Sequence, residues 1–170
     1  GAAYAAAGVQ HICFVERSPG SGAPALGFDY YALGCDMARR AIADGCRNPA
    51  ALLESHAFSS QSELLRGLRD VLDARGLPLT CRQTESSQCA GDAFDLLGAE
   101  VAPDAIFIGN YAFAQTLRSI IRHFHEGSPR LYSVSPLFAL PMGDFTEFEM
   151  NYRLLGRRAG GKAGHFFGGG

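Results

Sequence analysis

Short apolar runs alternate along the chain with longer segments in which apolar residues recur every three or four positions. The clearest pair lies in 104–121, where the run Ala105-Ile106-Phe107-Ile108 is followed at once by a pattern typical of an amphipathic helix. A buried strand is therefore expected to pass into a helix through one tight turn that contains Gly109, Asn110 and Tyr111.

The same alternation recurs elsewhere in the chain. Strands are expected at 11–16, 50–55, 77–84, 105–108 and 129–135, with a short extended segment at 145–150. Helices are expected at 29–44, 59–76, 89–99, after Gly109, and from 151 to 160. Between the first strand and the first helix, the Gly-, Pro- and Ser-rich segment 17–27 is interpreted as a loop.

Strands that alternate with helices predict βαβ units, and hence an α/β fold with a parallel β-sheet flanked by helices. Asp29 is a good N-cap for the first helix, and Gly45 and Gly76 are plausible stops for the first and second helices. The length of 170 residues suits one domain, here 1–160, followed by a Gly-rich tail at 161–170.

In parallel sheets, ligands bind outside the carboxyl ends of the strands. Polar residues stand at four such ends: Glu16 and Arg17, His56, Asn110 and Tyr111, and the segment 133–135. A carboxylate beside a guanidinium suits a polyol, although the same pair also suits a solvated strand end. Asn110 can cap the following helix, face a cleft, or do both. Tyr111 can stack on a ligand ring or pack at the rim of the domain.

Five motifs together resemble the effector-binding core of lactose-repressor-type (LacI/GalR) regulators, which share their fold with type I periplasmic sugar receptors. In chain order they are Val15-Glu16-Arg17, Asp29 followed by Gly34, "LLRGLRDVL" with Gly67, Pro103 to Ala114, and Phe145 to Ala159. The resemblance implies a periplasmic-binding-protein type I-like fold, of which this chain is mainly the second, C-terminal lobe with a hinge strand. The family's helix-turn-helix head and most of its first lobe are not in these residues.

The resemblance also implies a function. The chain would be the effector-binding domain of a transcriptional regulator that contacts DNA only through the missing head, works as a homodimer in the cytoplasm, and catalyses no reaction. The effector would be a sugar, a sugar phosphate or a purine-like compound. The expected ligand-binding residues are Glu16, Arg17, Ser62, Asn110, Tyr111 and Ser135.

One departure from the family pattern bears on the ligand. Tyr111 stands where the family has an aspartate, so the site loses a charged hydroxyl acceptor and gains a stacking face. We therefore expect a ligand with a flat part, or with an anionic group held by Arg17, in preference to a plain neutral hexose.

Composition narrows the alternatives. The net charge is -2, with 15 basic and 17 acidic residues and no basic stripe, which argues against direct nucleic-acid binding by this chain. No apolar run is long enough to span a membrane, and the N-terminal residues lack a signal-peptide pattern. Cysteines number 5, an odd count without C-x-x-C spacing, which favours reduced thiols in a cytosolic protein.

Two other functions remain open at this point. A type I solute receptor of a transport system would share the fold. A small α/β enzyme with a nucleotide or flavin is disfavoured, because no phosphate-binding glycine loop is present. His123 and His125 are two apart on an expected helix, so they point to different faces and no metal site is expected. No cofactor is expected either.

Overall fold

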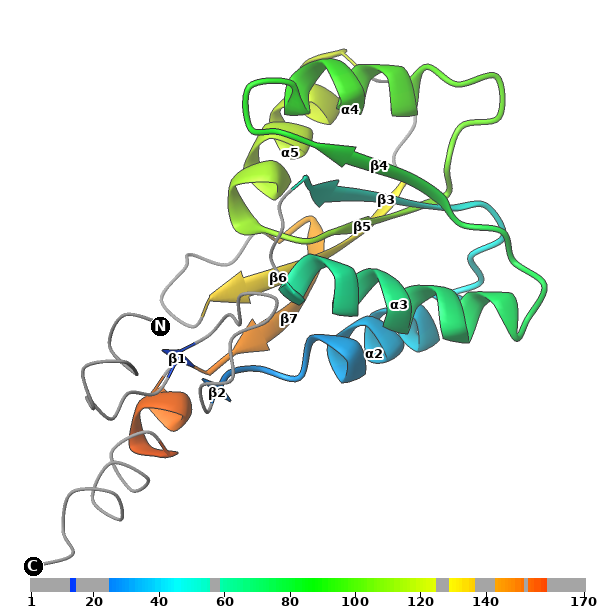
Figure 1. Ribbon diagram of the computed structural model, residues 1–170. Helices are drawn as coiled ribbons and strands as arrows, with labels where there is room; N and C mark the ends of the chain where they lie inside the picture. The colour runs from blue at the N-terminus through cyan, green and yellow to red at the C-terminus, as the bar shows by residue number, and fades with distance from the viewer. Residues whose placement is uncertain are drawn as a thin grey trace, which may run out of the picture.

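The computed structural model describes residues 13–14, 25–55, 59–124, 129–136, 143–151 and 153–158. Its centre is a sheet of five parallel strands in the order β4-β3-β5-β6-β7, which confirms the expected α/β fold (Figure 1). The strands are β3 (Pro49–Glu54), β4 (Thr80–Thr84), β5 (Ala105–Ile108), β6 (Arg130–Pro136) and β7 (Phe145–Met150).

Two helices cover each face of this sheet. Alternate residues of a strand point to opposite faces, so the nearly continuous apolar runs bury both sides. Ala51 and Leu53 of β3 face α2 (Tyr30–Ala43) and α3 (Ser59–Asp73), whereas Ala50 and Leu52 face the core beneath α4 (Cys89–Leu97) and α5 (Tyr111–Phe124).

Helices α2 and α3 touch through their backbones. A Cβ atom added at Gly34 would overlap the backbone oxygen of Leu64, and one added at Gly67 would overlap the backbone oxygen of Tyr31. The helix axes therefore lie close together, and both glycines of the family-like motifs have a packing reason to be glycine.

Helix ends follow the sequence closely. Asp29 caps α2, since its Oδ1 accepts a hydrogen bond of 2.8 Å from the backbone N–H of Ala32. The chain leaves α2 and α3 through Gly45 and Gly76, whose φ angles of 91° and 66° lie in the left-handed region that favours glycine.

Two strand assignments differ from those made on the sequence. Part of the expected loop 17–27 is the two-residue strand β2 (Ala25–Leu26), which pairs in parallel with β1 (Cys13–Phe14). So short a pairing needs only extended backbone and leaves no periodicity in the sequence. The third expected strand begins at Thr80 rather than at residue 77, whereas the extended segment expected at 145–150 is confirmed as the edge strand β7.

Polar side chains at the amino edge of the sheet tie loops to strands. Asp104 accepts hydrogen bonds from the backbone N–H groups of Arg47 (2.6 Å) and Asn48 (3.0 Å) and from the thiol of Cys46 (3.2 Å). Burial alone would raise the pKa of Asp104, but these three donors outweigh it, and the net shift is downward. Burial, with the Asp104 carboxylate beside it, raises the pKa of Cys46 to about 12.

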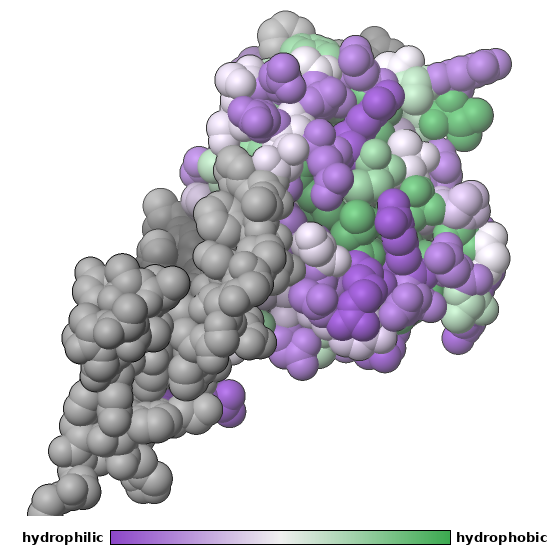
Figure 2. Space-filling model, viewed as in Figure 1, coloured by the Kyte–Doolittle hydropathy of each residue, from purple (hydrophilic) through white to green (hydrophobic). Residues whose placement is uncertain are grey.

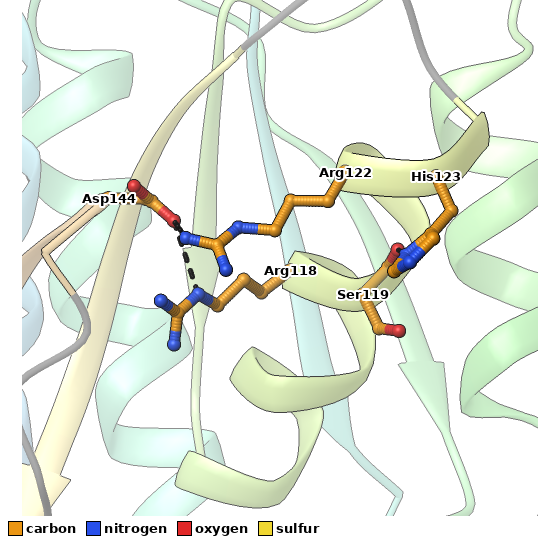
Figure 3. Close-up of polar contacts among 5 residues, drawn as sticks. All are labelled: Arg118, Ser119, Arg122, His123 and Asp144. Carbon is orange, nitrogen blue, oxygen red and sulfur yellow. Dashed lines mark hydrogen bonds and ion pairs between the residues drawn. The ribbon is translucent and has the colours of Figure 1, made fainter.

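A second group of polar contacts at this edge holds the start of β7 against α5. Just before β7, Asp144 accepts hydrogen bonds from Arg118 Nε at 3.1 Å and from a terminal nitrogen of Arg122 at 2.6 Å (Figure 3). The two guanidinium groups hold the pKa of Asp144 below its usual value, against a smaller opposing effect of burial. Figure 3 also shows the His123 ring turned back onto the backbone oxygen of Ser119, 2.8 Å away.

Four cysteines in the described part of the chain, Cys35, Cys46, Cys81 and Cys89, are free thiols. Cys35, Cys46 and Cys89 are buried, and Cys81 is partly buried. Within the described residues, no helix is long and apolar enough to cross a membrane.

Candidate functional site at the carboxyl edge of the sheet

The order of the strands creates a switch point between β3 and β5. The chain leaves β3 toward β4 on one side and leaves β5 toward β6 on the other, so the two connections diverge. A crevice outside the carboxyl ends of two such strands is the usual ligand site of an open parallel sheet.

Register brings five polar residues into one row at this edge. Glu54 pairs with Thr84, and Ser135 pairs with Glu149. Leu52 pairs with Ile108, and Ile108 pairs with Ser133. Each of these three paired residues is followed two positions later by a polar residue. Glu54, Asn110 and Ser135 are therefore level with one another. The row reads Thr84, Glu54, Asn110, Ser135 and Glu149 from one edge of the sheet to the other.

Asn110 is fixed by two hydrogen bonds. Its Oδ1 accepts from the backbone N–H of Phe113 at 2.8 Å, which caps α5. Its Nδ2 donates to Oε2 of Glu54 at 3.0 Å. The amide is thereby oriented by a helix end on one side and a carboxylate on the other.

Gln61 connects the start of α3 to the end of β5 through hydrogen bonds. Its side chain is only 6% exposed. Nε2 donates to the backbone oxygen of Gly109 at 3.2 Å, and Oε1 accepts from the backbone N–H of Glu54 at 3.4 Å. A Cβ atom at position 109 would overlap Oε1 of Gln61, so a side chain there would displace the Gln61 amide from these hydrogen bonds.

Ser133 and Ser135 lie on the α5 side of β6, and both are buried. The hydroxyl of Ser133 donates to the backbone oxygen of Val134 at 3.2 Å. Ser135 is 4% exposed, and its hydroxyl has no hydrogen-bond partner among the described residues.

The structure brings Asn110 and Ser135, both expected from the sequence, into the same row. Tyr111 begins α5 half-buried and packs against the core beneath α4 and α5. Ser62 is exposed on α3, next to the buried Gln61. Glu16 and Arg17 lie outside the described residues. The ligand-binding roles of all six remain predictions.

Sequence reasoning missed Glu54 and Gln61. Glu54 is the one charged residue in the run 49–54 and stands at its end. Gln61 precedes Leu64, Leu65 and Leu68 at helical spacing, which puts a polar side chain on the buried face of α3. Both signals are visible in the sequence once the ends of these elements are known.

The chain thus folds as an open parallel α/β sheet with a row of polar residues at its carboxyl edge. No protein-family model matches the sequence, and no curated protein matches it. Solved structures do match the chain, and among them are LacI-type regulators and a sugar-binding protein.

Three of these structures illustrate the similarity. A LacI transcriptional regulator from Rhodococcus species has a TM-score of 0.80 and 17% identity over 99% of this chain and 66% of that one. The regulator CcpA of Lactococcus lactis has a TM-score of 0.77 and 14% identity over 93% and 61%. GanP, a glucose-galactose binding protein from Geobacillus stearothermophilus, has a TM-score of 0.77 and 18% identity over 91% and 60%.

These likenesses establish the fold, which is periplasmic-binding-protein-like, as the sequence motifs led us to expect. The chain spans about three fifths of the length of the first structures it matches, 58% to 60%.

Proposed function

We propose that the chain is the effector-binding core of a LacI-type transcriptional regulator. In this proposal residues 1–160 form most of the second lobe with a hinge strand, and 161–170 are a tail. The chain binds a small molecule and catalyses no reaction. Glu16, Arg17, Ser62, Asn110, Tyr111 and Ser135 contribute to the ligand site.

The observation that carries the proposal is the row at the switch point. Asn110 is oriented by the N-terminus of α5 and by Glu54, and Ser135 offers a buried hydroxyl in line with it. The polar groups of the amino edge described above, by contrast, are engaged in holding loops and strands together. A small molecule with several hydroxyl or amine groups is the ligand that fixed amides and hydroxyls bind best.

Regulation would follow from unequal affinity for two arrangements of the lobes. An effector that binds one arrangement more tightly shifts the equilibrium toward that arrangement. The change in the free energy of the equilibrium cannot exceed the difference between the effector's binding free energies for the two arrangements. A DNA-binding head outside this chain would respond to that shift, and the protein would act in the cytoplasm.

Surface composition supports a homodimer. Figure 2 shows apolar side chains gathered over the edge strand β4, between α3 and α4. Phe94 of α4 is 45% exposed, and Val101 in the loop before β5 is 71% exposed. Exposed apolar surface of this kind is typical of a subunit interface.

The alternative is a solute receptor of a transport system, because GanP has the same fold and is a glucose-galactose binding protein. A receptor would bind its sugar with no effect on any DNA complex. Effector-dependent release or capture of operator DNA by the regulator therefore separates the two functions.

Ligand binding is tested first by calorimetry with sugars, sugar phosphates and purines. Asn110→Ala removes an amide at the carboxyl edge, and Asn48→Ala removes one at the amino edge, where it donates to the backbone oxygens of Val101 and Ala102. We expect the Asn110 variant to bind the best ligand at least about tenfold more weakly and the Asn48 variant to bind it normally. Equal affinity of both variants and the wild type would remove this edge from the ligand site.

A further inference from the structure

Glu54 and Asn110 stand at the ends of the neighbouring strands β3 and β5, and a hydrogen bond of 3.0 Å joins their side chains. We propose that Glu54 is a positioning residue of the ligand site. Its carboxylate fixes which way round the Asn110 amide is presented, and Glu54 acts on the ligand through that amide. This role rests on the proposed effector site and goes further, because it links ligand affinity to a residue outside the expected set.

A side-chain amide can occupy the same space in two orientations, related by a half turn that exchanges its oxygen and its nitrogen. The contacts of Asn110 select one of them. Its Oδ1 accepts from the backbone N–H of Phe113 at 2.8 Å, and its Nδ2 donates to Oε2 of Glu54. A half turn would set the amide nitrogen against the N–H of Phe113 and the amide oxygen against the carboxylate, so both hydrogen bonds would be lost.

The contact with Glu54 contributes more to this selection than the contact with Phe113. A hydrogen bond to a carboxylate is about twice as strong as one between neutral groups. The carboxylate also accepts only, so it offers nothing to the reversed amide. Asn110 is partly exposed, and the second hydrogen of its Nδ2 and the second lone pair of its Oδ1 have no partner among the described residues. These two groups face a ligand in a fixed order.

The backbone beneath the pair is held independently of the Glu54 side chain. Gln61, only 6% exposed, accepts from the backbone N–H of Glu54 at 3.4 Å and donates at 3.2 Å to the backbone oxygen of Gly109, the residue before Asn110. The ends of β3 and β5 are thereby connected through α3. A change in the side chain at position 54 should therefore alter the orientation of the amide and leave the strands in place.

Substitutions at position 54 test this role. E54Q keeps an oxygen that can accept from Asn110, whereas E54L removes every acceptor at a similar size. E100L is the matched control, because it makes the same replacement in the exposed loop before β5, at the opposite edge of the sheet. Asn110→Ala removes the amide through which Glu54 would act. Thermal melting verifies that each variant is folded.

Binding is measured by calorimetry of the purified protein with glucose, galactose, glucose 6-phosphate and adenosine, and the variants are compared for the compound that binds most tightly. We expect E54L to weaken binding by about 10-fold, a coupling typical of hydrogen-bonded neighbours, and E54Q to stay within about twofold of the wild type. E100L should bind normally. In the Asn110→Ala background, E54L should cause no further loss, because the amide that Glu54 orients is absent.

The orientation itself is followed by NMR of the Asn110 side-chain amide, whose resonances are those missing from the spectrum of Asn110→Ala. In the wild type and in E54Q, the hydrogen bond to position 54 should slow the exchange of these amide hydrogens with water. In E54L their exchange should quicken, whereas E100L should leave it unchanged. A role of Glu54 in stability alone would lower the melting temperature without changing ligand affinity.

The outcomes separate the two proposals. If Asn110→Ala weakens binding and E54L does not, the role of Glu54 is overturned and the effector site stands. An equal loss from E54L with and without the Asn110 amide would also overturn it, because Glu54 would then act on the ligand directly. If none of the four compounds binds, the effector site fails and the positioning role fails with it. A loss in E54L that E54Q restores and that disappears in the Asn110→Ala background would support both.

Discussion

The contact between α2 and α3 allows a quantitative test of the packing. Gly67→Ala adds one methyl group, whose carbon would lie 3.0 Å from the backbone nitrogen of Cys35 and well below 3.0 Å from the backbone oxygen of Tyr31. Real Cβ atoms essentially never come closer than 3.0 Å, so the helices must separate. No side chain can move aside, because the opposing atoms are backbone.

Two opposing effects set the magnitude. Overpacking of a well-packed core costs about 1–3 kcal/mol, and a clash with backbone belongs at the upper end. Alanine in place of glycine within a helix gains about 1 kcal/mol. The net loss is therefore about 2 kcal/mol, which lowers the midpoint of thermal unfolding by about 4–8 °C for a chain of this size.

A matched control is Gly91→Ala in α4, where an added Cβ would meet nothing within 4 Å. That variant should gain up to about 1 kcal/mol and unfold at the same or a higher temperature. Both are measured by calorimetric or circular-dichroism melting. If Gly67→Ala is as stable as the wild type, or if Gly91→Ala is destabilised to the same extent, the close approach of the two helices is not what requires glycine at position 67.

Three further predictions concern polar groups at the two edges. The pKa of Asp104 is below its usual 3.8, so its ionised form stabilises the fold above about pH 4, and this contribution is lost as pH falls through the lower folded pKa. Asp104→Asn should therefore show a shallower fall in stability between about pH 5 and 2, as followed by urea denaturation. Asn110→Ala should lower stability by about 0.5–2 kcal/mol through loss of the α5 cap, and amide exchange in the first turn of α5 should quicken. Cys46 is only 3% exposed, and burial together with Asp104 raises the pKa of its thiol to about 12. It should therefore resist alkylation in the folded protein at pH 8. Modification at the rate of an unfolded thiol would contradict this environment.

Much of the fold could be predicted from local patterns. Apolar runs and helical spacing located the strands and helices, and Asp29, Gly45 and Gly76 marked helix ends, because caps and left-handed turns depend on neighbouring residues alone. The pairing of β1 with β2 left no such signal. It is a contact between segments that no local periodicity reports.

The candidate site was less accessible to sequence reasoning, because it depends on strand order and register. Nothing in the sequence indicates that β3 lies beside β5, and only that neighbourhood places Glu54 against Asn110. For the same reason Ser135 could be proposed as a strand-end residue, but not as a member of one row with Asn110. Gln61 was missed because a buried polar side chain in a helix becomes meaningful only when its partner is known.

The contact between Gln61 and Gly109 has a consequence for how sequences of this kind can diverge. The two positions are 48 residues apart in the chain, yet a Cβ atom at position 109 would overlap the end of the Gln61 side chain. With glutamine at position 61, a side chain at position 109 would cost the two hydrogen bonds that the Gln61 amide makes, whereas a shorter residue at position 61 would leave space for it. In an alignment of related chains, glutamine at position 61 should therefore occur mainly with glycine at position 109, and larger residues at 109 mainly with shorter residues at 61.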